Sequence, residues 1–212
     1  MNDDPGQQLD HELYRSLYES RTILLGEPLE DRNSNRICNA LLVLAAEDPR
    51  AEIRLLINSP GGSVPGMLAI RDCMRAIPND VRTVNLGMAY SAGQFLLSSG
   101  TNGKRSAMTH SKVLLHQGSA GIGGTAMDIA IQADDLRRTR DTVLACIAED
   151  TGQSVAQVEE DSRRDRWFTA REALDYGFID TIVSSLDDVM PRRRSPIGLA
   201  ASGTGPAEGR SA

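Results

Sequence analysis

Gly87-Met88-Ala89-Tyr90-Ser91-Ala92-Gly93-Gln94 joins a predicted strand to a predicted helix and carries one serine at its centre. The β-branched and apolar run 81–86 leads into it, and the apolar run 95–97 leads out of it as the first turn of a buried helix. A turn of this kind can expose a serine hydroxyl while neighbouring amides point the same way. The alternative is that Ser91 only caps the helix that follows, as serine often does.

Strands and helices alternate outward from this turn. Residues 52–58 predict a strand, 59–63 a tight turn, and 65–76 a helix with apolar residues at helical spacing. Beyond the serine, residues 112–116 predict another short strand. This alternation indicates an α/β protein whose loops at the strand ends carry its function.

Further elements extend the pattern in both directions. We expect a strand at 22–25, helices at 32–46, at 125–151, after Ser154 and at 168–180, and a final strand at 181–183. Gly152 closes the longest of these helices as a C-terminal cap. A glycine-rich arm, 118–124, precedes that helix, which is either a protruding element that reaches a partner or an ordinary amphipathic surface helix.

The chain of 212 residues has room for one sizeable domain. We expect a disordered polar segment at 1–10, one domain at 11–188 and a disordered tail at 189–212. The tail begins with arginines and continues in glycine, alanine, serine and proline, a composition that cannot bury a core.

Composition argues against several classes of function. The formal charge of −6 gives no indication of nucleic-acid binding, and no apolar run reaches the roughly 18 residues that a membrane span needs. Cys38, Cys73 and Cys146 are far apart in apolar surroundings, so we expect reduced core cysteines rather than disulfides or a metal site. The N-terminus is acidic and polar, unlike a secretory signal, so we expect a cytoplasmic protein without membrane or nucleic-acid partners.

A serine nucleophile needs a base within hydrogen-bonding reach and an acid that orients this base. His116 ends a predicted apolar strand beside the glycine-rich arm, whereas His11 lies near the N-terminus and His110 in a polar loop. A histidine at a strand end is more often structural than catalytic. The orienting acid is one of many: Asp161 and Asp165 both lie in a charged segment that an ordinary solvated surface would also explain.

Acyl transfer also needs backbone N–H donors for the oxyanion of its tetrahedral intermediate. Gly61 and Gly62 follow a predicted strand and allow close approach of the backbone. Ala92, directly after the serine, offers another amide.

Four motifs follow one another along the chain. They are Asn58-Ser59-Pro60-Gly61-Gly62, Gly87-x-Ala89-x-Ser91-x-Gly93, Leu115-His116-Gln117 and Arg164-Asp165-Arg166. In this order, and at these spacings, they closely resemble the proteolytic subunit of the Clp protease (ClpP). The resemblance covers roughly residues 12–187.

The resemblance implies Ser91 as nucleophile, His116 as general base and Asp165 as its orienter, with an oxyanion hole at the amides of Gly62 and Ala92. It implies an α/β spiral of β-β-α units, of the type shared by ClpP and the crotonases, with a protruding handle at about 118–151. It also implies a serine endopeptidase in two stacked seven-membered rings. An AAA+ unfoldase that uses ATP would feed it unfolded polypeptides, and the proteolytic subunit itself would need no cofactor and no metal.

Three departures from the family pattern bear on activity and assembly. Gly118 stands where the family usually has a proline, so we expect a looser handle strand. The family docks its unfoldase in an apolar, aromatic-lined pocket, and the aligned positions here are Arg54, Leu56 and Ala76, which lack the aromatic side chains. Arg163 stands where the family has an acidic residue that pairs with an arginine of the opposite ring, so two identical rings would bring like charges together.

Three functions follow from these observations. The first is a serine endopeptidase subunit of the Clp type. The second is a structural or regulatory subunit with little activity alone, which stacks on a second ClpP-type subunit in a mixed assembly. The third is a crotonase-type acyl-CoA enzyme, which shares the spiral fold and a two-amide oxyanion hole but needs no Ser-His-Asp triad.

Overall fold

The computed structural model describes residues 5–118 and 121–190, so most of the tail expected at 189–212 lies outside the described residues. In chain order the elements are α1 (Pro5–Glu19), β1 (Thr22–Leu25), α2 (Asp31–Glu47), β2 (Ile53–Ser59), α3 (Val64–Ala76), β3 (Val81–Tyr90), α4 (Ala92–Ser98), β4 (Arg105–Met108), β5 (Lys112–Leu115), α5 (Ala126–Thr151), α6 (Val155–Ser162), β6 (Arg166–Thr169), α7 (Ala170–Tyr176), β7 (Thr181–Val183) and α8 (Leu186–Val189).

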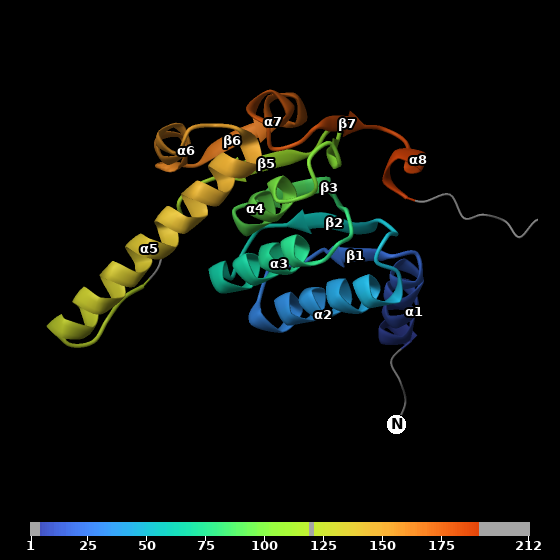
Figure 1. Cartoon of the computed structure of the whole chain (residues 1–212), viewed down its shortest axis with the longest axis horizontal. Coiled ribbons are helices and arrows are strands. Elements are labelled where there is room, and N and C mark those ends of the chain that lie inside the picture. The colour runs from blue at the N-terminus through green and yellow to red at the C-terminus, as the bar shows by residue number, and fades with distance from the viewer. Residues whose placement is uncertain (1–4, 119–120, 191–212) are drawn as a thin grey trace, which may run out of the picture.

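Mostly parallel strands form the centre of the molecule (Figure 1). Within the described residues the sheet has the order β1-β2-β3-β4-β7, and each of these neighbouring pairs is parallel. β5 pairs in parallel with the end of β3, and β6 pairs antiparallel with β5. The predicted α/β class is confirmed.

β3 changes its neighbour near Gly87, from β4 before it to β5 after it. Two asparagine side chains replace ladder hydrogen bonds at this irregularity: Asn58 Oδ1 accepts from Met88 N–H at 3.1 Å, and Asn85 Nδ2 donates to Lys112 O at 2.9 Å. A Cβ at Gly87 would lie 2.9 Å from Asn58 Oδ1, so glycine leaves the space that the asparagine needs. The motif residues Asn58 and Gly87 therefore shape the strand that ends at the serine.

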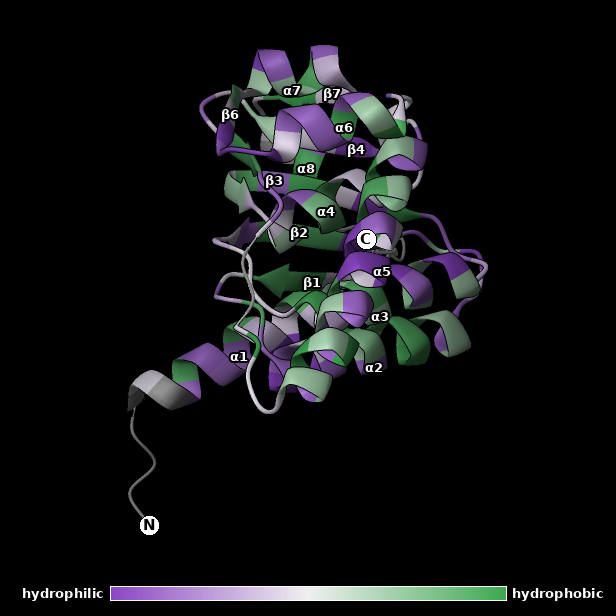
Figure 2. Cartoon of the chain, turned by 90° about the vertical axis from the view of Figure 1, so that its left-hand side faces the viewer, coloured by the Kyte–Doolittle hydropathy of each residue, from purple (hydrophilic) through white to green (hydrophobic). Residues whose placement is uncertain are grey.

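Helices α2, α3 and α4 cover one face of this sheet, and α2 and α3 run side by side along β1 and β2 in Figure 1. Ile37, Leu41 and Leu44 of α2 recur at three- and four-residue spacing and are buried, as helical periodicity requires. All seven residues of α4 are buried. The strands they cover are strongly hydrophobic, as β1 and β2 show in Figure 2.

Strand β4 and helix α8 were not predicted from the sequence, and the starts of two helices also differ from the prediction. α1 begins at Pro5, inside the segment 1–10 that was expected to be disordered. Proline suits the first turn of a helix, because an N–H there has no intrahelical acceptor. Phe168 lies in strand β6, and α7 begins only at Ala170, so the helix predicted from residue 168 was wrong at its start. Pairing with β5 overrides the local pattern there.

α5 extends away from the body of the molecule (Figure 1), and its apolar residues are buried only near its C-terminal end, at Leu144, Ile147 and Ala148. Large apolar side chains on the outer part are exposed, including Met127 (70% exposed) and Ile131. The cap at Gly152, in the left-handed conformation with φ 77°, confirms the predicted end of the helix. In the part of the chain that the structure describes, no helix combines the length and apolar character that crossing a bilayer requires.

A buried carboxylate anchors the C-terminal end of α5 to α3 and α4. Asp150, whose side chain is 0% exposed, accepts hydrogen bonds from Arg71 at 3.0 Å, from Arg75 at 2.6 Å and from the Ser99 hydroxyl at 3.0 Å. Burial lowers the pKa of the Arg71 guanidinium, but the hydrogen bonds and charge of Asp150 outweigh burial and raise this pKa above its ordinary value. α5 is therefore fixed at the helix that follows Ser91.

We expect Asp150→Ala to lower the free energy of unfolding by about 3–5 kcal/mol, because it leaves the buried Arg71 charge without its main partner. Urea unfolding at fixed protein concentration measures this. Asp134→Ala is the matched control on the same helix, since its ion pair with Arg137 is exposed, and it should change the free energy by less than about 0.5 kcal/mol. Equal effects of the two substitutions would contradict the anchoring role of Asp150.

Candidate active site

Ser91 occupies the junction of β3 and α4 in a strained backbone conformation, with φ 55° and ψ −115°. Among the described residues, Arg21 is the only other non-glycine with positive φ. Holding a side chain in this region costs of order 1–3 kcal/mol and is tolerated only where the surroundings enforce it. A strained serine between a strand and a helix has the geometry of a nucleophile.

The Ser91 side chain does not cap α4. Although Ser91 stands at the N-cap position, its hydroxyl accepts no hydrogen bond from the first turn of the helix. Capping serines elsewhere in the chain do so: Ser63 accepts from Gly66 N–H, and Ser154 accepts from Gln157 N–H. The alternative that Ser91 is only a helix cap is therefore wrong.

Gly61 makes room for the strained turn. Its φ is 101°, and a Cβ on it would lie 2.7 Å from Ser91 Cβ and 2.6 Å from Tyr90 O. Both distances are shorter than real Cβ contacts, so only glycine fits here. The Gly61-Gly62 turn thus packs directly on the serine.

Two backbone amides near the serine, those of Gly62 and Ala92, remain unpaired within the described residues. Leu29 and Gly62 form a parallel β-bridge, in which Leu29 N–H donates to Gly61 O and Ser63 N–H donates to Leu29 O. The N–H of Gly62 itself therefore points away from Leu29. Ala92 N–H is the first of α4 and has no intrahelical acceptor. Neither amide makes a hydrogen bond within the described part of the chain.

The register of β3 and β5 brings His116 toward the serine. Tyr90 pairs with Leu114, and Ser91 N–H donates to Leu114 O at 2.9 Å. His116 follows two residues later on β5, just past the end of the strand. Two segments separated along the chain are therefore aligned by main-chain pairing.

The antiparallel register of β5 and β6 places Asp165 opposite His116. Leu115 pairs with Arg166, so His116, which follows Leu115, faces Asp165, which precedes Arg166. His116 Nδ1 and Asp165 Oδ1 lie 3.4 Å apart, and the side chains are 30% and 62% exposed. No hydrogen bond between Ser91 Oγ and His116 occurs in the described structure.

Asp161, the other candidate for the orienting acid, is engaged elsewhere. It accepts from the Tyr176 hydroxyl at 3.0 Å and from Gln157 Nε2 at 2.9 Å, and it forms an ion pair with Arg166. These bonds belong to the packing of α6 against β6 and α7. The structure therefore brings Asp165, not Asp161, to His116.

An aromatic pair that the sequence reading missed flanks the candidate site. Tyr90 immediately precedes the serine and meets Trp167 edge to face, with ring centroids 4.9 Å apart. Both belong to one cross-strand row with Leu114, two residues along β5 from His116, so they lie on the same face of the sheet as the imidazole. Trp167 is 51% exposed. Strand register, which a sequence alone does not supply, is the signal that would have found this pair.

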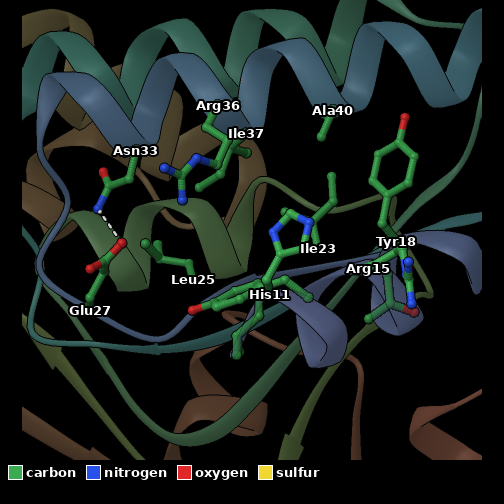
Figure 3. Close-up of a pocket in the computed structure, with 13 residues that line it drawn as sticks. His11, Arg15, Tyr18, Ile23, Leu25, Glu27, Asn33, Arg36, Ile37 and Ala40 are labelled. Atoms are coloured by element: carbon green, nitrogen blue, oxygen red, sulfur yellow. Dashed lines mark hydrogen bonds between the residues drawn. The ribbon is translucent and has the colours of Figure 1, made fainter. Parts of the chain in front are cut away.

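Neither of two cavities, each of about 270 Å³, is lined by Ser91 or His116. One lies between α1, β1 and α2, with Tyr18, Ile23 and Ile37 in its walls, and Figure 3 shows His11 projecting into it. The other lies between β6 and α7. Ser91 itself is partly buried.

The cysteines are only half-buried, and all three are free thiols. They lie on α2, α3 and α5, outside the strand ends that carry Ser91 and His116. Among the described residues, no group of three or more His, Cys, Asp or Glu side chains is arranged to hold a metal ion.

Comparison with known proteins gives one consistent family. A family model described as Clp protease matches residues 5–186. The ATP-dependent Clp protease proteolytic subunit 3 of Streptomyces coelicolor is 52% identical over 195 residues, which cover 91% of this chain and 90% of the relative. Subunit 3 of Rhodococcus jostii is 53% identical over 184 residues (86% and 91%), and subunit 2 of Corynebacterium diphtheriae is 49% identical over 180 residues (85% and 90%).

Gly61→Ala should abolish reaction of the serine with a fluorophosphonate probe, because the new Cβ forces Tyr90 O and Ser91 out of place. Gly26→Ala is the matched control, since its Cβ would meet only ordinary contacts with Leu24 at 3.5 Å. Covalent labelling, read by intact-protein mass spectrometry, measures the effect. Labelling of Gly61→Ala at the wild-type rate would show that this close approach does not shape the site.

Proposed function

The chain belongs to the Clp protease family of proteolytic subunits, and on that premise we propose that it hydrolyses peptide bonds with Ser91 as nucleophile, His116 as general base and Asp165 as its orienter. The amides of Gly62 and Ala92 form the oxyanion hole. The family match leaves no observation in favour of a crotonase-type acyl-CoA enzyme.

The proposed reaction follows the positions of these groups. Ser91 Oγ attacks the scissile carbonyl carbon as His116 Nε2 takes its proton, while Asp165 accepts from Nδ1–H and holds the ring in that tautomer. The carbonyl oxygen becomes an oxyanion between the two unpaired amides. His116 then protonates the leaving amine, and water hydrolyses the acyl-enzyme by the same steps in reverse order.

One observation carries this proposal: main-chain pairing of β3, β5 and β6 gathers a strained serine, a histidine and an aspartate at one end of the sheet. A histidine with a purely structural role would require neither a carboxylate opposite it nor a neighbouring strand that ends in a serine without a capping bond. Free amides at Gly62 and Ala92 add the electrostatic part of the site.

The proposed substrates are unfolded polypeptides, delivered by an AAA+ unfoldase to two stacked seven-membered rings in the cytoplasm. The exposed apolar residues on the outer part of α5 support an assembly, because a free chain would leave Met127 and Ile131 in water. The extent proposed for the domain, 11–188 with a handle at about 118–151, includes this helix.

A regulatory subunit of a mixed ring is the second candidate, and specific observations favour it. Asp165 is largely exposed, its contact with His116 is long, and Ser91 Oγ is not yet bonded to the base. Arg54, at an expected docking position, is paired with Glu52 at 2.9 Å, and Arg163 is paired with Glu160 at 2.9 Å within the same chain. A second ClpP-type subunit would then supply the docking pocket and shorten the contacts among Ser91, His116 and Asp165.

Reaction with a fluorophosphonate probe, alone and with a co-expressed second subunit, tests both candidates. We expect covalent labelling at Ser91, its complete loss in Ser91→Ala, and a rate at least roughly 1000-fold lower in His116→Ala. His110→Ala, on an exposed turn, is the control and should label normally. Labelling only with the second subunit would favour the regulatory role, and its absence under both conditions would overturn the proposed activity.

Trp167→Ala should raise KM about 10-fold for peptides with a large apolar side chain next to the scissile bond, because it removes aromatic area beside the nucleophile. The rate of fluorophosphonate labelling should stay within about twofold, since the triad is untouched. Val155→Ala, which shortens an exposed apolar residue on α6, is the control. An unchanged KM in Trp167→Ala would contradict a role of this aromatic pair in substrate binding.

A further inference from the structure

The His116–Asp165 pair lies beyond the last rung of the β5–β6 ladder. Pairing of β5 with β6 ends at Leu115 and Arg166, so neither His116 nor Asp165 is held by that ladder. Their contact of 3.4 Å is long for a charge-assisted hydrogen bond. With Asp165 62% exposed, water competes for the carboxylate. Something other than the pair itself has to keep the two side chains aligned.

Gln117 supplies a second fixed point on the other side of this pair. Its N–H donates to Ser162 O at 2.9 Å, and its side-chain amide donates to Ser162 Oγ at 3.3 Å and to Glu159 O at 3.3 Å. Ser162 is 1% exposed, and its hydroxyl donates to Glu159 O at 3.1 Å. The residue after the histidine is therefore tied to a buried serine three residues before Asp165.

Gly118, the next described residue, offers no comparable support. Gly118 is in the left-handed region with φ 67°, and a Cβ there would meet nothing within 4 Å. Glycine leaves the backbone free at the start of the arm. The hydrogen bonds of Gln117 are thus the last contacts that fix β5 before the glycine-rich arm.

We propose that Gln117 is a positioning residue, whose side-chain amide joins the strand of His116 to the end of α6 and so aligns His116 with Asp165. The inference rests on the proposed triad. The β5–β6 ladder at Leu115 and the hydrogen bonds at Ser162 hold the two segments together on either side of the pair. Two points of attachment restrict rotation of the segments relative to each other more than one does. Gln117 touches no reacting atom and acts only through the imidazole–carboxylate contact.

A double-mutant cycle on the full chain tests this role, with hydrolysis of a short peptide and the rate of fluorophosphonate labelling as readouts. In the wild-type background, Gln117→Ala should lower kcat and the labelling rate by roughly 10- to 100-fold with little change in KM. In the Asp165→Asn background, Gln117→Ala should cost no further activity, because the contact that it aligns is already lost. Gln117→Glu should resemble Gln117→Ala, since it keeps the length but loses both donors.

Gln153→Ala is the matched control: its amide also donates to a backbone carbonyl, Tyr176 O at 3.1 Å, but lies outside the candidate site. It should leave kcat unchanged in both backgrounds. An equal loss from Gln117→Ala with and without Asp165 would indicate a merely structural role and overturn the proposal, as would no loss in either. If Asp165→Asn itself had no effect, the triad assignment would fail instead, and the two failures are distinguishable.

Discussion

The left-handed backbone at Ser91 is the constraint on which the rest of this structure depends. A side chain in this conformation costs of order 1–3 kcal/mol, and it persists because both sides of the turn are fixed. On the side of the preceding strand, β5 holds the serine through the hydrogen bond from Ser91 N–H to Leu114 O. On the other side, α4 is buried along its whole length. In this position the hydroxyl makes no capping hydrogen bond to the helix that follows it.

The glycine turn and the strained serine depend on one another. Gly61 approaches Ser91 more closely than any residue with a Cβ could, and the same turn directs the amide of Gly62 away from Leu29. The change of partner by β3 near Gly87 then brings β5 beside the serine. The strained serine, the glycine turn and the change of strand partner at Gly87 therefore depend on one another. His116 directly follows β5, the strand that pairs with the end of β3.

Much of this arrangement was predictable from local signals. Turn glycines, apolar periodicity and the cap at Gly152 predicted the elements between residues 22 and 160 except strand β4, and the four motifs identified the family. β6 escaped prediction because the side chain of Phe168 fits a helix start as well as a strand, and only its pairing with Val113 decides between them. Local patterns carry no information on such long-range pairing.

The choice among acids was also beyond local pattern. Asp161 and Asp165 stand four residues apart in one charged segment, and the structure separates them by their partners. Asp161 binds Tyr176 and Arg166, whereas Asp165 faces His116. Gln117 is similar: the Leu115-His116-Gln117 motif includes it but indicates no role for its side chain, and its contact with the buried Ser162 appears only when α6 packs beside β5. Register and packing between distant segments therefore decide the functional details.

The most direct measurement of the central claim is the structure of a covalent adduct of this protein with a peptide boronate or fluorophosphonate. The account predicts a bond to Ser91 Oγ, with the oxygen of the adduct about 2.7–3.1 Å from the backbone nitrogens of both Gly62 and Ala92. It also predicts His116 between Ser91 and Asp165. An adduct on another residue, or an oxygen that contacts neither amide, would contradict it.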